Sequence, residues 1–176
     1  GQLLSFCRPG GEGDLRRLGV QAGDVVAYLA PPGGSAVAAA AFLSIASQTC
    51  AVPFSPTMSE ADTLLALEQY GVKHIVLFEG VSAPGLHAAF DRYAGSGKAH
   101  IHHAHLRGEA SPGLFKYLNP VDDFHSLPAL VNPPTADCLL LRTSGSTSVP
   151  KVVPLRQRDL VINAAILADG IGLSSS

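Results

Sequence analysis

Three short apolar runs recur along the first half of the chain, and no polar residue interrupts them apart from His74, which begins the third. They occupy residues 25–29, 50–53 and 74–78. A strand with one face in water alternates apolar and polar positions, whereas a continuous apolar run indicates a strand that is buried on both faces. The pattern therefore predicts three buried strands.

Helical patterns fill the spaces between these runs. Ser35 and Ser59 each precede a segment with helical character and are expected to cap its first turn. The second of these helices is expected to stop at Gly71, and a third is expected over about 83–93. Strands that alternate with helices across short loops are typical of an α/β fold, so we predict a parallel sheet flanked by helices.

The second half of the chain is less regular. Five prolines fall within residues 95–135, and this segment is predicted to be rich in loops. A strand follows over 138–142, and after a polar loop we expect a short strand at 152–153 and a helix over about 157–168. The sheet is thus predicted to continue beyond the irregular segment.

Composition narrows the class of protein. The chain has 176 residues, of which 15% are charged and 47% hydrophobic, with a net charge of −2. This length supports a core without metals or disulfides, and the absence of a basic excess argues against a nucleic-acid partner. No apolar stretch approaches the roughly 20 residues of a membrane span. Three widely spaced cysteines predict buried thiols in a reducing compartment, which points to the cytoplasm, with a peroxisome or another organelle left open.

The most informative segment is the polar loop after the strand at 138–142. Its hydroxyls, its glycine and its terminal lysine suit an anion, because backbone N–H groups in such a turn form an anion-binding hollow and lysine adds a positive charge. The candidate phosphate-binding residues are Thr143, Ser144, Gly145, Ser146, Thr147, Ser148 and Lys151. A P-loop needs glycine before the lysine and a hydroxyl after it, but here Pro150 and Val152 stand in those places. An ordinary surface turn is the alternative interpretation.

The order Thr-Ser-Gly-Ser-Thr at 143–147, followed by Pro150-Lys151, resembles the phosphate-binding loop of the adenylate-forming (AMP-binding) superfamily, in particular the acyl-CoA synthetases. The segments 18–27, 51–56 and 70–76 resemble strands of the same family. Ser148 and Val152 depart from the pattern, because glycine is usual at both places, and this should stiffen the loop. The resemblance implies that 18–176 is part of an AMP-binding N-terminal domain and that 1–17 is an irregular or helical remnant.

The resemblance also implies a reaction. A carboxylic acid would be activated with ATP and Mg²⁺ to an acyl-adenylate, and coenzyme A would be the acceptor. The loop hydroxyls would donate to the β- and γ-phosphate oxygens, and Lys151 would hold the loop near the phosphates or contact them directly. Arg142, Arg156 and Arg158 stand close to the loop in sequence and could raise its positive potential, although a solvated helix start is favoured for the arginines.

Several parts of the family pattern have no counterpart in the sequence, namely the acidic motif for Mg²⁺, an aspartate for the ribose and the C-terminal lid with its lysine. We therefore expect an N-terminal fragment that lacks the C-terminal segments of a parent chain and is inactive alone. The alternative is a truncated, non-catalytic nucleotide-binding or interaction protein of the same fold. The acid substrate is not indicated.

A cluster of histidines raises the question of a metal site. On a strand, His100 and His102 would share one face and His103 and His105 the other, so neither face offers three ligands without a distant partner. A polar surface stretch is favoured, and no metal-ligating residue is predicted.

Overall fold

The computed structural model describes residues 1–31, 35–108, 111–143 and 150–172. Within these residues the chain forms a seven-stranded sheet in the order β5-β4-β3-β1-β2-β6-β7. The strands are β1 (Val25–Leu29), β2 (Cys50–Pro53), β3 (His74–Phe78), β4 (His100–Leu106), β5 (Phe115–Tyr117), β6 (Asp137–Arg142) and β7 (Val152–Arg156). Pairing is parallel from β4 to β6, and the outer strands β5 and β7 are antiparallel to their neighbours. The predicted α/β fold is confirmed.

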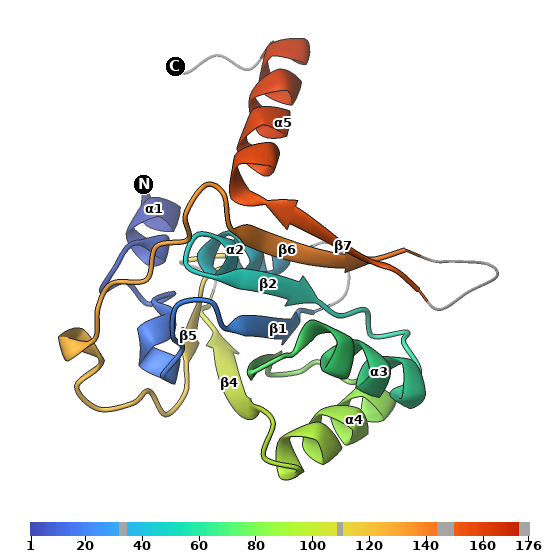
Figure 1. Ribbon diagram of the computed structural model, residues 1–176. Coiled ribbons are helices and arrows are strands. Elements are labelled where there is room, and N and C mark those ends of the chain that lie inside the picture. Colours follow the sequence, from blue (N-terminus) through green and yellow to red (C-terminus); the bar gives the residue numbers. More distant parts are fainter. Residues whose placement is uncertain (32–34, 109–110, 144–149, 173–176) are drawn as a thin grey trace.

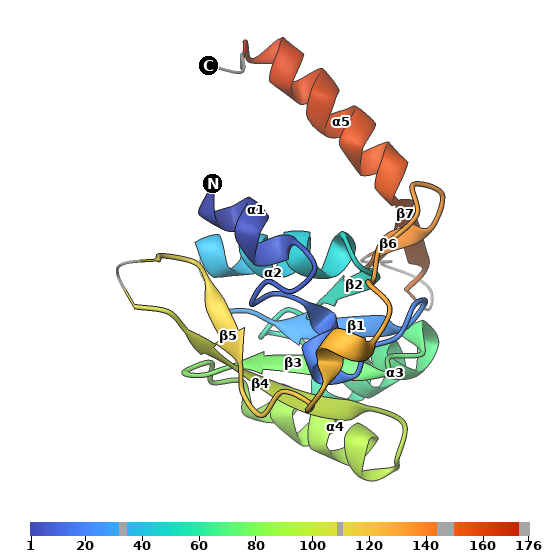
Figure 2. The same cartoon turned by 90° about the vertical axis from the view of Figure 1, so that its left-hand side faces the viewer.

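Helices cover both faces of this sheet. They are α1 (Gln2–Cys7), α2 (Ala36–Ala46), α3 (Glu60–Tyr70), α4 (Pro84–Gly95) and α5 (Gln157–Gly170), with short 3₁₀ turns η1 (Leu15–Leu18) and η2 (Phe124–Ser126). In Figures 1 and 2, α1 and α2 lie on one face while α3 and α4 lie on the other. The last helix, α5, stands away from the sheet and has no buried residue among those described.

The helix boundaries follow from local chemistry. The Ser59 hydroxyl accepts a hydrogen bond from the Asp62 amide at 3.1 Å, which satisfies one of the free N–H groups in the first turn of α3. The helix ends at Gly71, whose φ of 62° lies in the left-handed region that glycine adopts without strain. Ser35 caps α2 in the same way. These sequence predictions are therefore confirmed.

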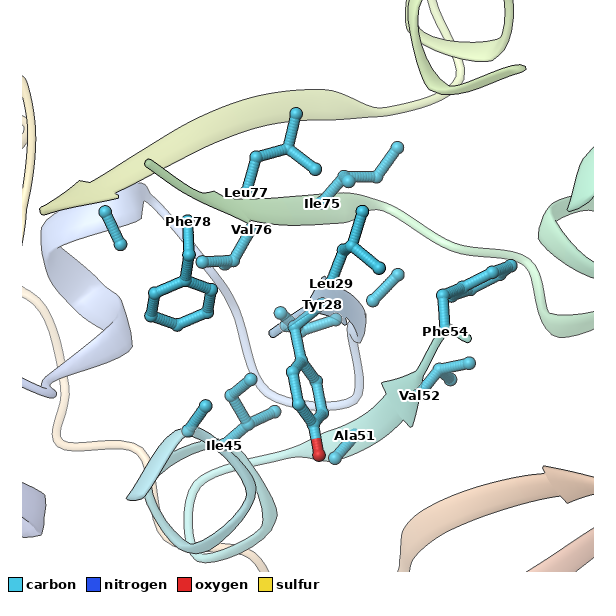
Figure 3. Close-up of a cluster of buried hydrophobic side chains, with 14 of the residues drawn as sticks. Tyr28, Leu29, Ile45, Ala51, Val52, Phe54, Ile75, Val76, Leu77 and Phe78 are labelled. Atoms are coloured by element: carbon cyan, nitrogen blue, oxygen red, sulfur yellow. The ribbon is translucent and has the colours of Figure 1, made fainter. Parts of the chain in front are cut away.

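The core lies between the three central strands and the helices on either side. Figure 3 shows that Val76 and Phe78 point to one side of β3, whereas Ile75 and Leu77 point to the other. All four are buried, as expected for a strand with both faces covered. Ile45 of α2 packs in the same cluster.

The segment 95–135 is more ordered than its prolines predicted. It holds β4, which pairs in parallel with β3 over five residues, and β5, which closes that side of the sheet. The prediction of a loop-rich segment is therefore wrong for these residues. The sequence did not reveal β4 because this strand has no continuous apolar run. Only Ala104 in β4 is buried, since β4 lies beside the edge strand.

The described helices include none with the length and apolarity that crossing a bilayer requires.

Candidate phosphate-binding site

The candidate loop leaves the sheet at the carboxyl edge of its parallel strands. β6 runs parallel to β2 and ends at Arg142, and β7 returns antiparallel from Val152. In open α/β sheets, ligands bind outside the carboxyl ends of the strands. The loop therefore begins where this architecture places a ligand.

Thr143 and Lys151 meet at the base of the loop. The Thr143 amide donates to the Lys151 carbonyl oxygen at 3.0 Å, and the Lys151 amide donates to Thr143 Oγ1 at 3.3 Å. Both residues are exposed. The structure thus brings together two of the seven predicted site residues. The others, Ser144, Gly145, Ser146, Thr147 and Ser148, lie outside the described residues.

The arginine just before the loop forms a hydrogen bond with α3, a helix that covers one face of the sheet. Arg142 Nη1 donates to the Asp62 carbonyl oxygen in the first turn of α3 at 3.0 Å. Its Nε and Nη2 atoms are buried and have no hydrogen-bond partner within the described residues. The sequence did not predict this contact, because Asp62 and Arg142 are far apart in the chain and a backbone carbonyl carries no sequence signal.

A small cavity of about 200 Å³ adjoins Arg142. Its walls are mostly apolar and come from the end of β2, α3 and β6: Pro53, Phe54, Ser55, Met58, Ala66, Tyr70, Leu140, Leu141 and Arg142. Burial raises the pKa of Tyr70, and the nearby Arg142 cation partly offsets that rise. The positive charge of Arg142 therefore influences Tyr70, which lines the cavity at the root of the loop.

The other two arginines do not join this site. β7 is antiparallel to β6, and its register places Arg156 beside Asp137 at the opposite end of β6. That end is about 17 Å from Arg142 at the other end of β6, at 3.3–3.4 Å per residue. Arg158 pairs with its neighbour Asp159 at 3.5 Å. These positions agree with the favoured interpretation, a solvated helix start.

Metal ligands do not converge at this site. As the side chains stand in the described part of the chain, no group of three or more His, Cys, Asp or Glu could hold a metal ion.

Comparison with known proteins identifies the family of the chain. A family model described as "AMP-binding enzyme" matches residues 14–173. No curated protein sequence matches the chain. Among solved structures, the chain is similar to apo MatB from Rhodopseudomonas palustris, with 16% identity and a TM-score of 0.63, over 95% of this chain and 31% of that one.

A second relative comes from Bacillus subtilis. It is o-succinylbenzoate coenzyme A synthetase (MenE) in complex with ATP and a magnesium ion, with 17% identity and a TM-score of 0.63, over 99% of this chain and 32% of that one. The chain spans about a third of the length of both relatives. At these identities the two structures support the fold, while the family model covers most of the sequence. The chain belongs to the AMP-binding enzyme family.

Proposed function

We propose that this chain forms the phosphate-binding part of an ATP-dependent ligase that activates a carboxylic acid. The observation that carries the proposal is the pairing of Thr143 with Lys151 at the carboxyl end of β6, in a chain of the AMP-binding family. The pairing sets a hydroxyl and a lysine at the two ends of a loop that is rich in hydroxyls and contains glycine.

The reaction transfers an adenylyl group. A carboxylate oxygen attacks the α-phosphorus of ATP, and the bond to the oxygen that bridges to the β-phosphate breaks, so pyrophosphate leaves and an acyl-adenylate remains. Coenzyme A is the acceptor we favour. Its thiol sulfur would then attack the acyl carbonyl carbon, and AMP would leave. Negative charge grows on the departing pyrophosphate, and fixed N–H dipoles with a lysine are suited to stabilise it.

Lys151 is the residue with the clearest role in this proposal. Its ammonium is a compact, mobile charge on an exposed side chain, and its backbone is fixed to Thr143. The loop root is therefore held while the ammonium can reach a phosphate oxygen. Mg²⁺ commonly binds through substrate phosphates and few carboxylates, so it would arrive with the nucleotide.

We further propose that these residues alone do not catalyse adenylation. Positioning several groups together supplies much of the rate in such reactions. The described residues contribute the flanks of one phosphate-binding loop and no converging acidic set for a metal. A nucleotide-binding protein without catalytic activity is the second candidate, and it requires the same loop.

Both candidate functions, the ligase and the non-catalytic nucleotide-binding protein, require the loop to bind a nucleotide. A binding experiment tests this shared requirement. A fluorescent ATP analogue titrated into the chain should bind, and Lys151→Ala should weaken binding about tenfold or more, because a charge-assisted contact is worth about 1.5–3 kcal/mol. Lys116→Ala is the matched control, since Lys116 is exposed on β5 at the far side of the sheet. Equal affinities in all three proteins would contradict the loop assignment.

Exchange of labelled pyrophosphate into ATP separates the two candidates. The protein with its complete natural chain should show exchange that depends on a carboxylic acid if it is a ligase. Binding without exchange in that protein would favour the non-catalytic candidate. Strong acid-dependent exchange by these 176 residues would overturn the proposal that they are inactive alone.

A further inference from the structure

A chain of hydrogen bonds crosses three strands at the amino edge of the sheet, opposite the candidate loop. His74 Nε2 lies 3.3 Å from Asp24 Oδ2, and His74 Nδ1 lies 3.0 Å from His102 Nε2. Asp24 directly precedes β1, His74 begins β3 and His102 lies near the start of β4. These strands are neighbours in the order β4-β3-β1, so the three side chains join the amino ends of three adjacent strands.

The two imidazoles meet edge to edge. Their planes differ by 20°, and their ring centroids are 5.3 Å apart, which is farther than the 3.0 Å between the facing nitrogens. A hydrogen bond between two ring nitrogens needs one donor and one acceptor. An ionised carboxylate only accepts, so Asp24 holds the proton of His74 on Nε2 and leaves Nδ1 to accept from His102. The order of donors and acceptors is therefore fixed while both rings are neutral.

This arrangement can take up one proton but not two. The first can bind Nδ1 of His102, and the hydrogen bond between the rings remains, because Nε2 of His102 still donates. A second proton has to bind Nδ1 of His74, so two N–H groups of two cations then face each other across 3.0 Å. The hydrogen bond is lost, and the two like charges repel each other.

The groups around the pair are mostly basic. Apart from Asp24, the charged or titratable side chains that line the same cavity of about 560 Å³ with the pair are basic: Lys73, Lys98 and His100. Lys98 is paired with Glu68 of α3, and His103 is exposed on the other face of β4. Among the described residues that line the cavity, Asp24 is the only carboxylate, and it faces one ring only. One anion therefore cannot balance two imidazolium rings.

Burial also disfavours the charged rings. Burial and the neighbouring histidines lower the pKa of His102 to about 4. Burial lowers the pKa of His74 as well, and Asp24 offsets part of that effect. A histidine that is released to water regains a pKa of about 6.5, so the released form binds more protons below that pH. The stabilisation that is complete above about pH 6.5 is therefore lost as the pH falls toward about 4.

The amino half of β4 is the part of the sheet that can separate. β5 pairs only with residues 104–106 of β4, so β3 is the one strand neighbour of residues 100–103 within the described part of the chain. Ala104 is the only buried residue of β4. Besides the contact between His74 and His102, this half is held by strand pairing with β3, such as the 2.9 Å hydrogen bond from the His100 amide to the Lys73 carbonyl oxygen.

We propose that Asp24, His74 and His102 form an acid-sensitive switch, which holds the amino half of β4 on the sheet near neutral pH and releases it when both imidazoles are protonated. The inference is independent of the proposed function, because the switch lies at the opposite edge of the sheet from the candidate loop.

Hydrogen exchange measured by mass spectrometry tests the switch in the whole chain. Protection of the amides of residues 100–103, corrected for the intrinsic effect of pH, should fall about tenfold or more between pH 7.5 and 5, because each pH unit below about 6.5 favours release by up to about tenfold for each displaced proton. Protection of the β1 amides should fall less, since β1 lies in the centre of the sheet. An equal loss in β1 and β4 would contradict the separate release of β4.

A variant separates the pair from other titrating groups. His102→Gln keeps an N–H donor for His74 but removes one of the two titrating rings, so β4 protection should fall less than about threefold over the same range. His103→Gln is the matched control, because His103 is exposed on the opposite face of β4, and it should keep the full loss of protection.

NMR of the ring nitrogens in the unchanged chain keeps the test valid if a variant folds poorly. The rings of His74 and His102 should still be neutral in the folded protein at about pH 5.5, where an ordinary histidine is mostly protonated. The proposal is overturned if His102→Gln loses β4 protection as the unchanged chain does. It is also overturned if both rings are protonated at that pH while β4 stays protected.

Discussion

Asp14 and Arg16 form a buried ion pair at the start of η1. Arg16 Nη2 lies 2.6 Å from Asp14 Oδ2, and the two residues are 7% and 1% exposed. Arg16 Nη1 also donates to the Leu127 carbonyl oxygen at 2.6 Å, and Asp14 accepts from the Gly10 amide at 2.7 Å. The pair therefore joins the N-terminal segment to a loop more than a hundred residues away.

Removing one charge of this pair should destabilise the protein. Asp14→Asn keeps the shape but leaves the Arg16 guanidinium buried without its anion, and we expect a loss of about 3 kcal/mol in the free energy of unfolding at pH 7. Urea denaturation followed by circular dichroism measures it. Asp122→Asn, at an exposed aspartate, should change the free energy by less than about 0.5 kcal/mol. A similarly small change in the free energy of unfolding for Asp14→Asn would contradict the assignment of a buried ion pair.

The same pair predicts a dependence on pH. Burial by itself would raise the pKa of Asp14, but hydrogen bonds from Arg16 and Gly10 bring it below its ordinary value. The stabilisation is therefore complete above the unfolded pKa of about 3.9 and is lost as the pH falls through the lower pKa of the folded state. The difference between the unchanged chain and Asp14→Asn should be constant from pH 7 to 5 and shrink below pH 4. A difference that grows on acidification would contradict this sign.

The sequence predicted the central sheet well because the signals there are local. Each buried strand is an apolar run, and the cap at Ser59 and the stop at Gly71 depend on single residue types. The contacts of Asp62 with Arg142 and of His74 with His102 could not be predicted, because strand order and register bring those residues together.

Arg142 should contribute little to stability although two of its guanidinium nitrogens are buried. It gains one hydrogen bond to Asp62, but two of its buried N–H groups have no partner within the described residues. An unsatisfied buried donor costs about 1–3 kcal/mol. Arg142→Met fills a similar volume without those donors, so we expect a change within about 1 kcal/mol in urea denaturation. A loss above about 2 kcal/mol would show that the guanidinium has partners beyond Asp62.

Two leucines differ in exposure, because one lies in the core and the other lies in the exposed helix α5. Leu67 in α3 is fully buried, whereas Leu167 in α5 is 65% exposed. Leu67→Ala should cost about 2–5 kcal/mol, because it leaves a cavity, while Leu167→Ala should change stability by less than about 0.5 kcal/mol. Denaturant unfolding of this chain compares them directly. If Leu167→Ala cost as much as Leu67→Ala, α5 would have to pack against something in solution.

Thr143 provides the most direct link between structure and the proposed function. Its Oγ1 accepts from the Lys151 amide and so fixes one end of the candidate loop to the other. Thr143→Val keeps the shape and removes the hydroxyl, so we expect a loss of about 1 kcal/mol in stability and five- to tenfold weaker binding of a fluorescent ATP analogue. Thr143→Ser retains the oxygen and is the matched control, with affinity close to that of the unchanged chain. If valine at this position lowered stability but left affinity unchanged, Thr143 would close the hairpin between β6 and β7 without contributing to phosphate binding. Weaker binding by the serine variant as well would indicate that the methyl group matters, through packing at the end of β6.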